Sequence, residues 1–185
     1  MDSFSYLSVL LSIVVGLAIT QVLQGLRALM LARGSARIYA PSLIWAALML
    51  LIATQMWWAS FGLQDHREWT FGIFGLILLQ FALFYLASSL VLPDLAPERI
   101  DLERDYYRNR GWFFGILAAA AVASLVKDLA LEGELPELPN LLFHFVLIAT
   151  CGVAMTTSNR TYHKLLAPIS MVLFVGYIAL LFARL

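Results

Sequence analysis

Cysteine and charge are scarce in this sequence, and their scarcity excludes several kinds of protein. The 185 residues include one cysteine, Cys151, so the chain forms no intrachain disulfide and no metal site built from its own cysteines. Only 13% of the residues are charged, and the 12 basic side chains balance the 12 acidic ones. Nucleotide-binding glycine loops are absent as well. We therefore expect neither a disulfide scaffold nor a nucleic-acid partner.

The apolar stretches also lack the groups that most membrane enzymes and cofactor sites need. His144 is the one histidine inside such a stretch, whereas a haem held between helices needs a pair of histidines. Carboxylates are absent from every stretch except the fourth, and no nucleophile lies beside a base. The sequence therefore predicts a protein that is not an enzyme and that holds no cofactor and no metal.

What the chain has in abundance is apolar sequence. Hydrophobic residues make up 62% of it, more than a soluble domain of this length can bury. A helix needs roughly 20 residues to cross a hydrocarbon core about 30 Å thick, and such stretches occur at residues 4–26, 42–63, 70–92, 111–131, 141–158 and 165–183. The sequence predicts an all-α fold, a polytopic integral membrane helical bundle of six transmembrane helices. We expect residues 1–185 to form a single transmembrane domain that is surrounded by the lipid bilayer.

The fourth stretch is the weakest of these predicted spans. Its uninterrupted apolar run, residues 112–126, is short, and a full span has to include Lys127 and Asp128. If this stretch does not cross the membrane, it is a re-entrant helix and the protein has one span fewer.

Basic residues mark one side of the predicted bundle. Lys and Arg in short connections are retained on the cytoplasmic side, and nine of the 12 lie in the first, third and fifth connections: Arg27, Arg33, Arg37, Arg99, Arg104, Arg108, Arg110, Arg160 and Lys164. We expect these connections on the cytoplasmic side of the cytoplasmic membrane and both termini on the other side. Aromatic residues near the ends of the spans, among them Trp45, Tyr106 and Trp112, are expected to be lipid-facing interface anchors.

The third connection, residues 93–110, is the one sizeable polar segment. From Pro97 it reads as a helix start that continues into the fourth span, with charge pairs such as Asp105 and Arg108. Its arginines either meet anionic lipid or a cytoplasmic partner, or they belong to a solvated extension that fixes the fourth helix.

Small residues recur at every fourth position in two of the predicted helices. The first helix has the row Ser8, Ser12, Gly16, Thr20 and Gln24, and the fourth has the row Gly111, Gly115, Ala119, Ala123 and Lys127. Small side chains at this spacing let two helices approach closely, so we expect both to pack against another helix or another membrane protein. The rows run in opposite directions, and the segments that begin at Pro41 and Pro139 resemble each other, which suggests a 3+3 inverted repeat.

Polar side chains inside the spans are the candidate site residues, because such groups are costly in lipid. The candidates for a pore or ligand lining are Gln21, Gln24, Gln55, Lys127, Asp128 and His144, and Gln80 is a further polar residue within a span. Lys127 and Asp128 are about 100° apart on a helix, so we expect one of them to point inward. In the alternative interpretation the glutamines bond neighbouring helices, the charged pair reaches water, and His144 is structural rather than a metal ligand with His66.

Three functions fit this pattern. The first is a small multispan protein that associates with itself and conducts or carries a small solute or ion. The second is a non-catalytic accessory or scaffold subunit of a larger membrane complex. The third is a lipid- or pigment-binding protein, in view of the 5 tryptophans, 7 tyrosines and 12 phenylalanines. A wetted polar cavity would favour the first function, and a dry bundle with its small-residue face against another protein would favour the second.

Overall fold

The computed structural model describes residues 3–32, 34–66, 68–93 and 100–181, most of which are helical. The helices are α1 (Ser3–Leu31), α2 (Ala40–Ser60), the short 3-10 helix η1 (Phe61–Asp65), α3 (Phe71–Leu90), α4 (Leu102–Glu132), α5 (Leu138–Thr156) and α6 (Arg160–Leu181). All six α-helices are long and apolar enough to cross a membrane, and these residues contain no strand. The predicted all-α membrane bundle is confirmed.

The weakest of the predicted spans is a complete helix. α4 runs without a break over 31 residues, about 46 Å at 1.5 Å per residue, so the re-entrant alternative is wrong. The described part of the helix begins at Leu102, and the expected start at Pro97 lies outside the described residues. Asp101 caps this start, because its carboxylate accepts a hydrogen bond from the backbone N–H of Arg104 at 3.0 Å. The polar first turns and the membrane span therefore form one rod.

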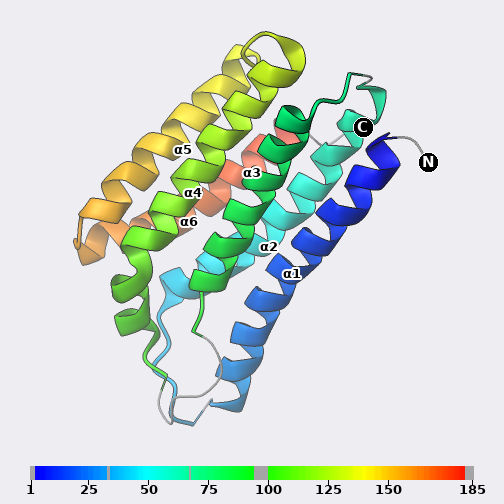
Figure 1. Cartoon of the computed structure of the whole chain (residues 1–185). Helices are drawn as coiled ribbons and strands as arrows, with labels where there is room; N and C mark the ends of the chain where they lie inside the picture. The colour runs from blue at the N-terminus through cyan, green and yellow to red at the C-terminus, as the bar shows by residue number, and fades with distance from the viewer. Residues whose placement is uncertain (1–2, 33, 67, 94–99, 182–185) are drawn as a thin grey trace.

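The two ends of the bundle differ in charge. The start of α1 and the end of α6 lie at one end, with the connections that follow α2 and α4 (Figure 1). We call this the termini end, and its charged side chains include Glu68, Lys127, Asp128, Glu132, Glu134 and Glu137. The connections that follow α1, α3 and α5 lie at the opposite end, the arginine end, near Arg27, Arg37, Arg104, Arg108, Arg110 and Arg160.

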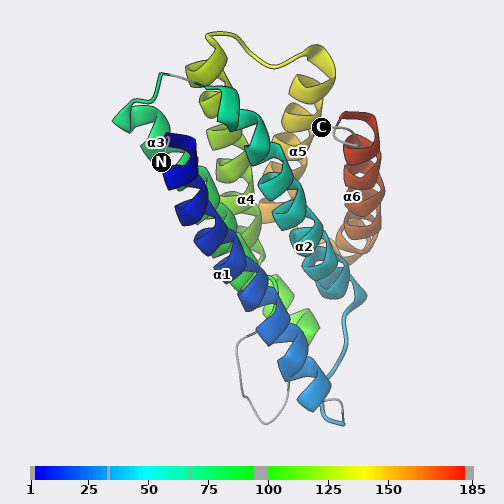
Figure 2. The same ribbon diagram turned by 90° about the vertical axis from the view of Figure 1, so that its right-hand side faces the viewer.

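Helix packing is uneven around the bundle. α3 packs along both α1 and α4, α4 packs along α5, and α2 lies between α1 and α6. α5 and α6 follow each other in the chain but contact each other at few positions, because α6 packs against α2 instead (Figure 2). This arrangement does not repeat between the halves: α1 packs extensively on α3, whereas α4 and α6 have no comparable contact. The suggested 3+3 inverted repeat is therefore not found in the packing of the described helices.

The small-residue row of α1 faces away from the bundle. Ser12, Gly16, Thr20 and Gln24 are exposed, and Ser8 is half-buried. The hydroxyls of Ser12 and Thr20 donate to carbonyls one turn back on the same helix. The helix instead buries the face that carries Leu7, Leu11, Val15, Ala18 and Val22, whose spacing of three and four residues is that of a helix seam. The row is thus free for contact with lipid or with another membrane helix.

The row of α4 is divided between two environments. Gly111 and Gly115 lie against Met155 of α5, at 3.9 and 4.0 Å from the position that a Cβ would occupy. Ala119 is exposed, whereas Ala123 is buried. An interval of four residues drifts by about 40° per step on an α-helix, so one straight seam does not hold the whole row.

Among the glycines, the tightest contact occurs at one that lies outside both rows. Gly25 of α1 faces Leu92, just beyond the end of α3, and a Cβ built on Gly25 would lie 2.5 Å from the Cβ of Leu92. The neighbour is an atom next to the backbone, so it has little room to move. Gly25 therefore sets the distance between α1 and α3.

We expect Gly25→Ala to destabilise the protein by about 1–3 kcal/mol, because the added methyl group overpacks this contact. Gly16→Ala is the matched control, since nothing lies within 4 Å of a Cβ at Gly16. The measurement is thermal unfolding in mild detergent, with oligomer size recorded for each variant. Equal melting temperatures for the two variants would contradict the close approach at Gly25.

Candidate functional site

The separation of α5 from α6 leaves a large cavity inside the bundle. Its volume is about 1090 Å³, and α2, α3, α4, α5 and α6 all contribute to its walls. Small-molecule sites usually enclose about 300–1,000 Å³, so this cavity is at the upper end of that scale. It extends from Glu137 at the termini end to Trp45 and Tyr162 near the arginine end, which is most of the length of the bundle.

Aromatic and polar contacts hold α5 and α6 together at both ends of the cavity. At the termini end the rings of Phe143 and Tyr177 are stacked with centroids 4.0 Å apart, and the Tyr177 hydroxyl donates to the side-chain oxygen of Asn140 at 3.1 Å. Near the arginine end the Tyr162 hydroxyl donates to the carbonyl of Thr150 at 3.3 Å. The two helices are thus joined at both ends of the cavity, and they have few contacts with each other along the rest of their described length.

The cavity also opens sideways between α5 and α6. Leu142 and Val146 of α5, and Ile169 and Leu173 of α6, line the cavity although each is more than half exposed. In a bilayer such exposed apolar side chains face lipid. Membrane-dissolved molecules can therefore reach the cavity between these two helices.

Charged and polar side chains gather in the half of the cavity near the termini end. Lys127 and Asp128 form an ion pair of 2.9 Å, with 21% and 16% of their side chains exposed, and both line the cavity. One of the two was expected to point inward, whereas both do, because the ion pair brings their side chains together. Gln80 of α3 also borders the cavity, and its buried Oε1 atom has no hydrogen-bond partner among the described residues.

The structure brings together four of the six candidate lining residues. Gln55, Lys127, Asp128 and His144 all border the cavity. The ring of His144 is buried, and its Nδ1 donates to the carbonyl of Asn140 at 2.9 Å, as in the structural interpretation of this residue.

The other two candidates lie on α1, which contributes no residue to the cavity. Gln21 donates to the hydroxyl of Tyr85 on α3 at 3.4 Å, and Gln24 is exposed. His66 does not belong to the lining either, and its ring bonds to the carbonyl of Glu68 at 3.0 Å. In the described part of the chain, no three His, Cys, Asp or Glu residues are grouped as a metal site.

Sequence reasoning missed the side chains that bridge α5 and α6. Asn140 follows Pro139 and lies at the very start of α5, so nothing in its position indicated a site. Phe143 and Tyr177 looked like two of many aromatic residues in apolar helices. Their role depends on the separation of α5 from α6, because these three side chains join the two helices across it.

A layer of aromatic rings separates the cavity from the arginine end. We call it the aromatic layer, and its members are Tyr39, Trp45, Tyr106, Tyr107, Phe113, Phe114 and His163. Trp45 lies edge-on to Phe113 and Phe114, with centroids 5.4 and 5.2 Å apart. Nε2 of His163 donates to the carbonyl of Thr157 at 3.0 Å, and its Nδ1 shares a hydrogen bond of 2.9 Å with the hydroxyl of Tyr106. These two bonds fix the orientation of the buried ring.

Two of the expected interface anchors therefore belong to the interior. Trp45 is 1% exposed and Tyr106 is buried, whereas Trp112 is exposed as expected. At the outer edge of the layer, the hydroxyls of Tyr39 and Tyr107 lie 3.1 Å apart. Burial and this hydrogen bond raise the pKa of Tyr39 above its ordinary value, so the phenol stays neutral.

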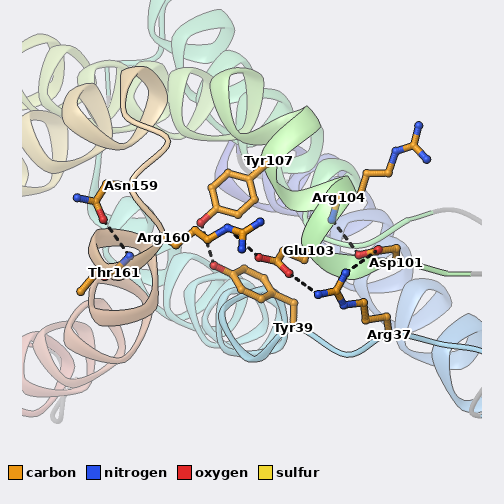
Figure 3. Close-up of polar contacts among 9 residues, drawn as sticks. All are labelled: Arg37, Tyr39, Asp101, Glu103, Arg104, Tyr107, Asn159, Arg160 and Thr161. Carbon is orange, nitrogen blue, oxygen red and sulfur yellow. Dashed lines mark hydrogen bonds and ion pairs between the residues drawn. The ribbon is translucent and has the colours of Figure 1, made fainter.

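Ion pairs join the connections at the arginine end (Figure 3). Glu103 on the first turn of α4 binds Arg37, from the connection before α2, at 3.2 Å, and Arg160, at the start of α6, at 3.3 Å. We call these three residues the ion-pair latch. Glu103 is 16% exposed, whereas both arginines are mostly exposed. The latch therefore draws α2 and α6 toward the start of α4 beyond the aromatic layer.

Backbone hydrogen bonds fix the position of Arg37 in this latch. Its N–H donates to the carbonyl of Ile100 at 2.7 Å, and its carbonyl accepts from the N–H of Leu102 at 3.1 Å. Its guanidinium also lies 3.5 Å from the carboxylate of Asp101. The Arg104 N–H and the charge of Arg37 hold the pKa of Asp101 below its ordinary value, so this carboxyl stays ionised.

The arginines of the third connection are divided between structural and exposed positions. Arg110 donates to the carbonyl of Thr157 at 3.0 Å and to the hydroxyl of Ser158 at 2.8 Å, so it caps the end of α5. Arg108 pairs with Asp105 on α4 at 2.8 Å, as expected. Arg99 lies outside the described residues. Only exposed arginines such as Arg104 are available to lipid or to a partner.

A search of protein-family models, curated proteins and solved structures found nothing that matches this chain. The architecture itself identifies a multi-pass helical membrane protein with a large cavity among five of its helices.

We expect Ser170→Cys, in a Cys151→Ala background, to react with a water-soluble thiol reagent added from the termini end. Ser170 lines the cavity, whereas Ser88 is buried outside it, so Ser88→Cys is the matched control. The measurement is the labelling rate in oriented membrane vesicles. Equal rates for the two variants would contradict a cavity that water enters from the termini end.

Proposed function

We propose that this protein is a carrier that binds a small solute in the cavity and exposes it to the two sides of the membrane in turn. The observation that supports this proposal is the extent of the cavity, which runs from the termini end to the aromatic layer. A carrier needs a central site that is reached from one side while the other side is closed. In this proposal the cavity is the central site, and the aromatic layer and the latch close the arginine end.

The polar lining supports a binding role over simple packing. A charged pair within a membrane span costs several kcal/mol unless it serves a cavity or a pathway. Lys127 and Asp128 lie in the cavity wall and not in a helix seam. A packing subunit would gain more stability from apolar residues at these two positions.

The latch is suited to open and close. Exposed ion pairs contribute about 0–1 kcal/mol each, and Arg37 and Arg160 are both mostly exposed. Ion pairs of that strength would permit the latch to be open in a minor population of molecules, and a carrier cycle requires such a population. By the distribution of basic residues, the arginine end would face the cytoplasm, and the open cavity would face the other side.

A second candidate function is that of an accessory or scaffold subunit. It is favoured by the row of Ser12, Gly16 and Thr20, which is exposed on the outer face of α1. The two hydroxyls bond to carbonyls of α1 itself, and nothing lies within 4 Å of a Cβ built on Gly16. Such rows bind other membrane helices. The two functions are compatible if the row joins copies of a carrier.

We expect Glu103→Gln to raise the labelling rate of Ser170→Cys from the arginine end about fivefold, because losing roughly 1 kcal/mol of closure shifts the population by that factor. Asp105→Asn is the matched control, since Asp105 is equally buried but pairs only with Arg108 of the same helix. The measurement is the labelling rate from each face of oriented vesicles. A site that stays unreactive from the arginine end in both variants would mean that the cavity is a blind pocket and the protein is not a carrier.

A further inference from the structure

We infer that the ligand of the cavity is a single-chain amphiphile whose head group carries a cationic nitrogen. Its head would lie at the termini end beside Asp128, and its chain would extend to Trp45. This inference rests on the proposed function, since it names the class of molecule that the same cavity binds.

The lining changes in polarity along the cavity. Lys127, Asp128 and Asn140 lie in the part near the termini end, where α4 finishes and α5 begins. The part near the aromatic layer is bordered by apolar side chains, among them Trp45 and Phe84. A molecule that fills both parts has a polar head and a long apolar chain.

The charges at the mouth favour a cation. The four charged residues in the lining are Lys127, Asp128, Glu132 and Glu137, so one positive charge stands against three negative ones. Lys127 is already paired with Asp128 at 2.9 Å, which leaves the two exposed glutamates at the rim without a positive partner in the lining. An anionic head would meet this excess of negative charge, whereas a cationic head is attracted by it.

Aromatic faces near the mouth suit the same head group. The stacked rings of Phe143 and Tyr177 both border the cavity, beside Asn140. Cationic nitrogen binds to aromatic faces through the ring quadrupole, and quaternary ammonium groups do so readily.

The sideways opening gives such a molecule an entrance. An amphiphile dissolved in the bilayer keeps its chain in hydrocarbon, and the apolar residues at the edges of α5 and α6 continue that environment into the cavity. The head moves along the membrane surface to the termini end. This route avoids the cost of moving the chain through water.

The test uses three probes with the same brominated chain: 12-bromododecyltrimethylammonium, 12-bromododecanol and 12-bromododecanoate. The protein is the full chain with Trp45 as its only tryptophan, the other four being replaced by Phe, in phosphatidylcholine vesicles. Trp45 is 1% exposed and lines the cavity, so bromine quenches its fluorescence only from within. We expect the cationic probe to quench Trp45 at a concentration about tenfold lower than the other two.

Two charge variants give changes of opposite sign. Asp128→Asn should raise the half-quenching concentration of the cationic probe about tenfold, because its closest negative partner is lost. Lys127→Met should lower it, because Asp128 is then released from its ion pair. Glu134→Gln removes a negative charge at the same end but outside the lining, so it should behave as the parent chain. Circular dichroism and thermal unfolding identify any variant that has lost its fold.

Each other outcome overturns the inference. Equal quenching by the three probes would mean that the cavity does not select a cationic head group. Stronger quenching by the carboxylate probe, lost in Lys127→Met, assigns an anionic ligand instead. The absence of quenching by every probe means that no apolar chain occupies the cavity. None of these results decides whether the protein is a carrier, because labelling from the two sides of the membrane measures that separately.

Discussion

The separation of α5 from α6 is the constraint on which the rest of the structure depends. Two consecutive helices with a short connection usually pack as antiparallel neighbours, but here α5 packs on α4 and α6 packs on α2. In lipid no hydrophobic force closes the gap, because hydrocarbon solvates apolar side chains as well as a helix does. The gap therefore persists between the bridge of Phe143 and Tyr177 and the contact of Tyr162 with Thr150, and it becomes the cavity.

The start of α4 is the fixed point around which the arginine end is organised. Glu103 binds the connection before α2 and the start of α6, and Arg110 binds the connection between α5 and α6. Tyr106 adds a buried hydrogen bond to His163. Because these bonds all lie at one end of the bundle, they tie α2, α5 and α6 to α4 there. The polar extension of α4 thus has a structural reason to continue beyond the membrane span.

The spans and part of the site could be predicted from the sequence, because both depend on local chemistry. Length and hydropathy identified the six helices, and the cost of a charge in lipid singled out Lys127 and Asp128. The packing could not be predicted in the same way. The row at Gly16 and the contact at Gly25 both have small residues on α1, and only the direction of the buried face tells them apart. Trp45 and Tyr106 resembled interface anchors, since an aromatic residue near the end of a span fits a membrane surface and a buried layer equally well.

Trp45 lies where the cavity meets the aromatic layer. Its ring borders the cavity on one side and meets Phe113 and Phe114 on the other, and Phe114 in turn faces His163 of α6. A chain that reaches this ring touches the aromatic layer directly, whereas its head beside Asp128 lies about 14 residues beyond Phe114 along α4, about 21 Å away by helix length. A ligand of this length would contact both the charged pair and the aromatic layer. A carrier built in this way would therefore couple the opening of the layer to the binding of a long amphiphile, because only a ligand with different contacts in the two states shifts their populations.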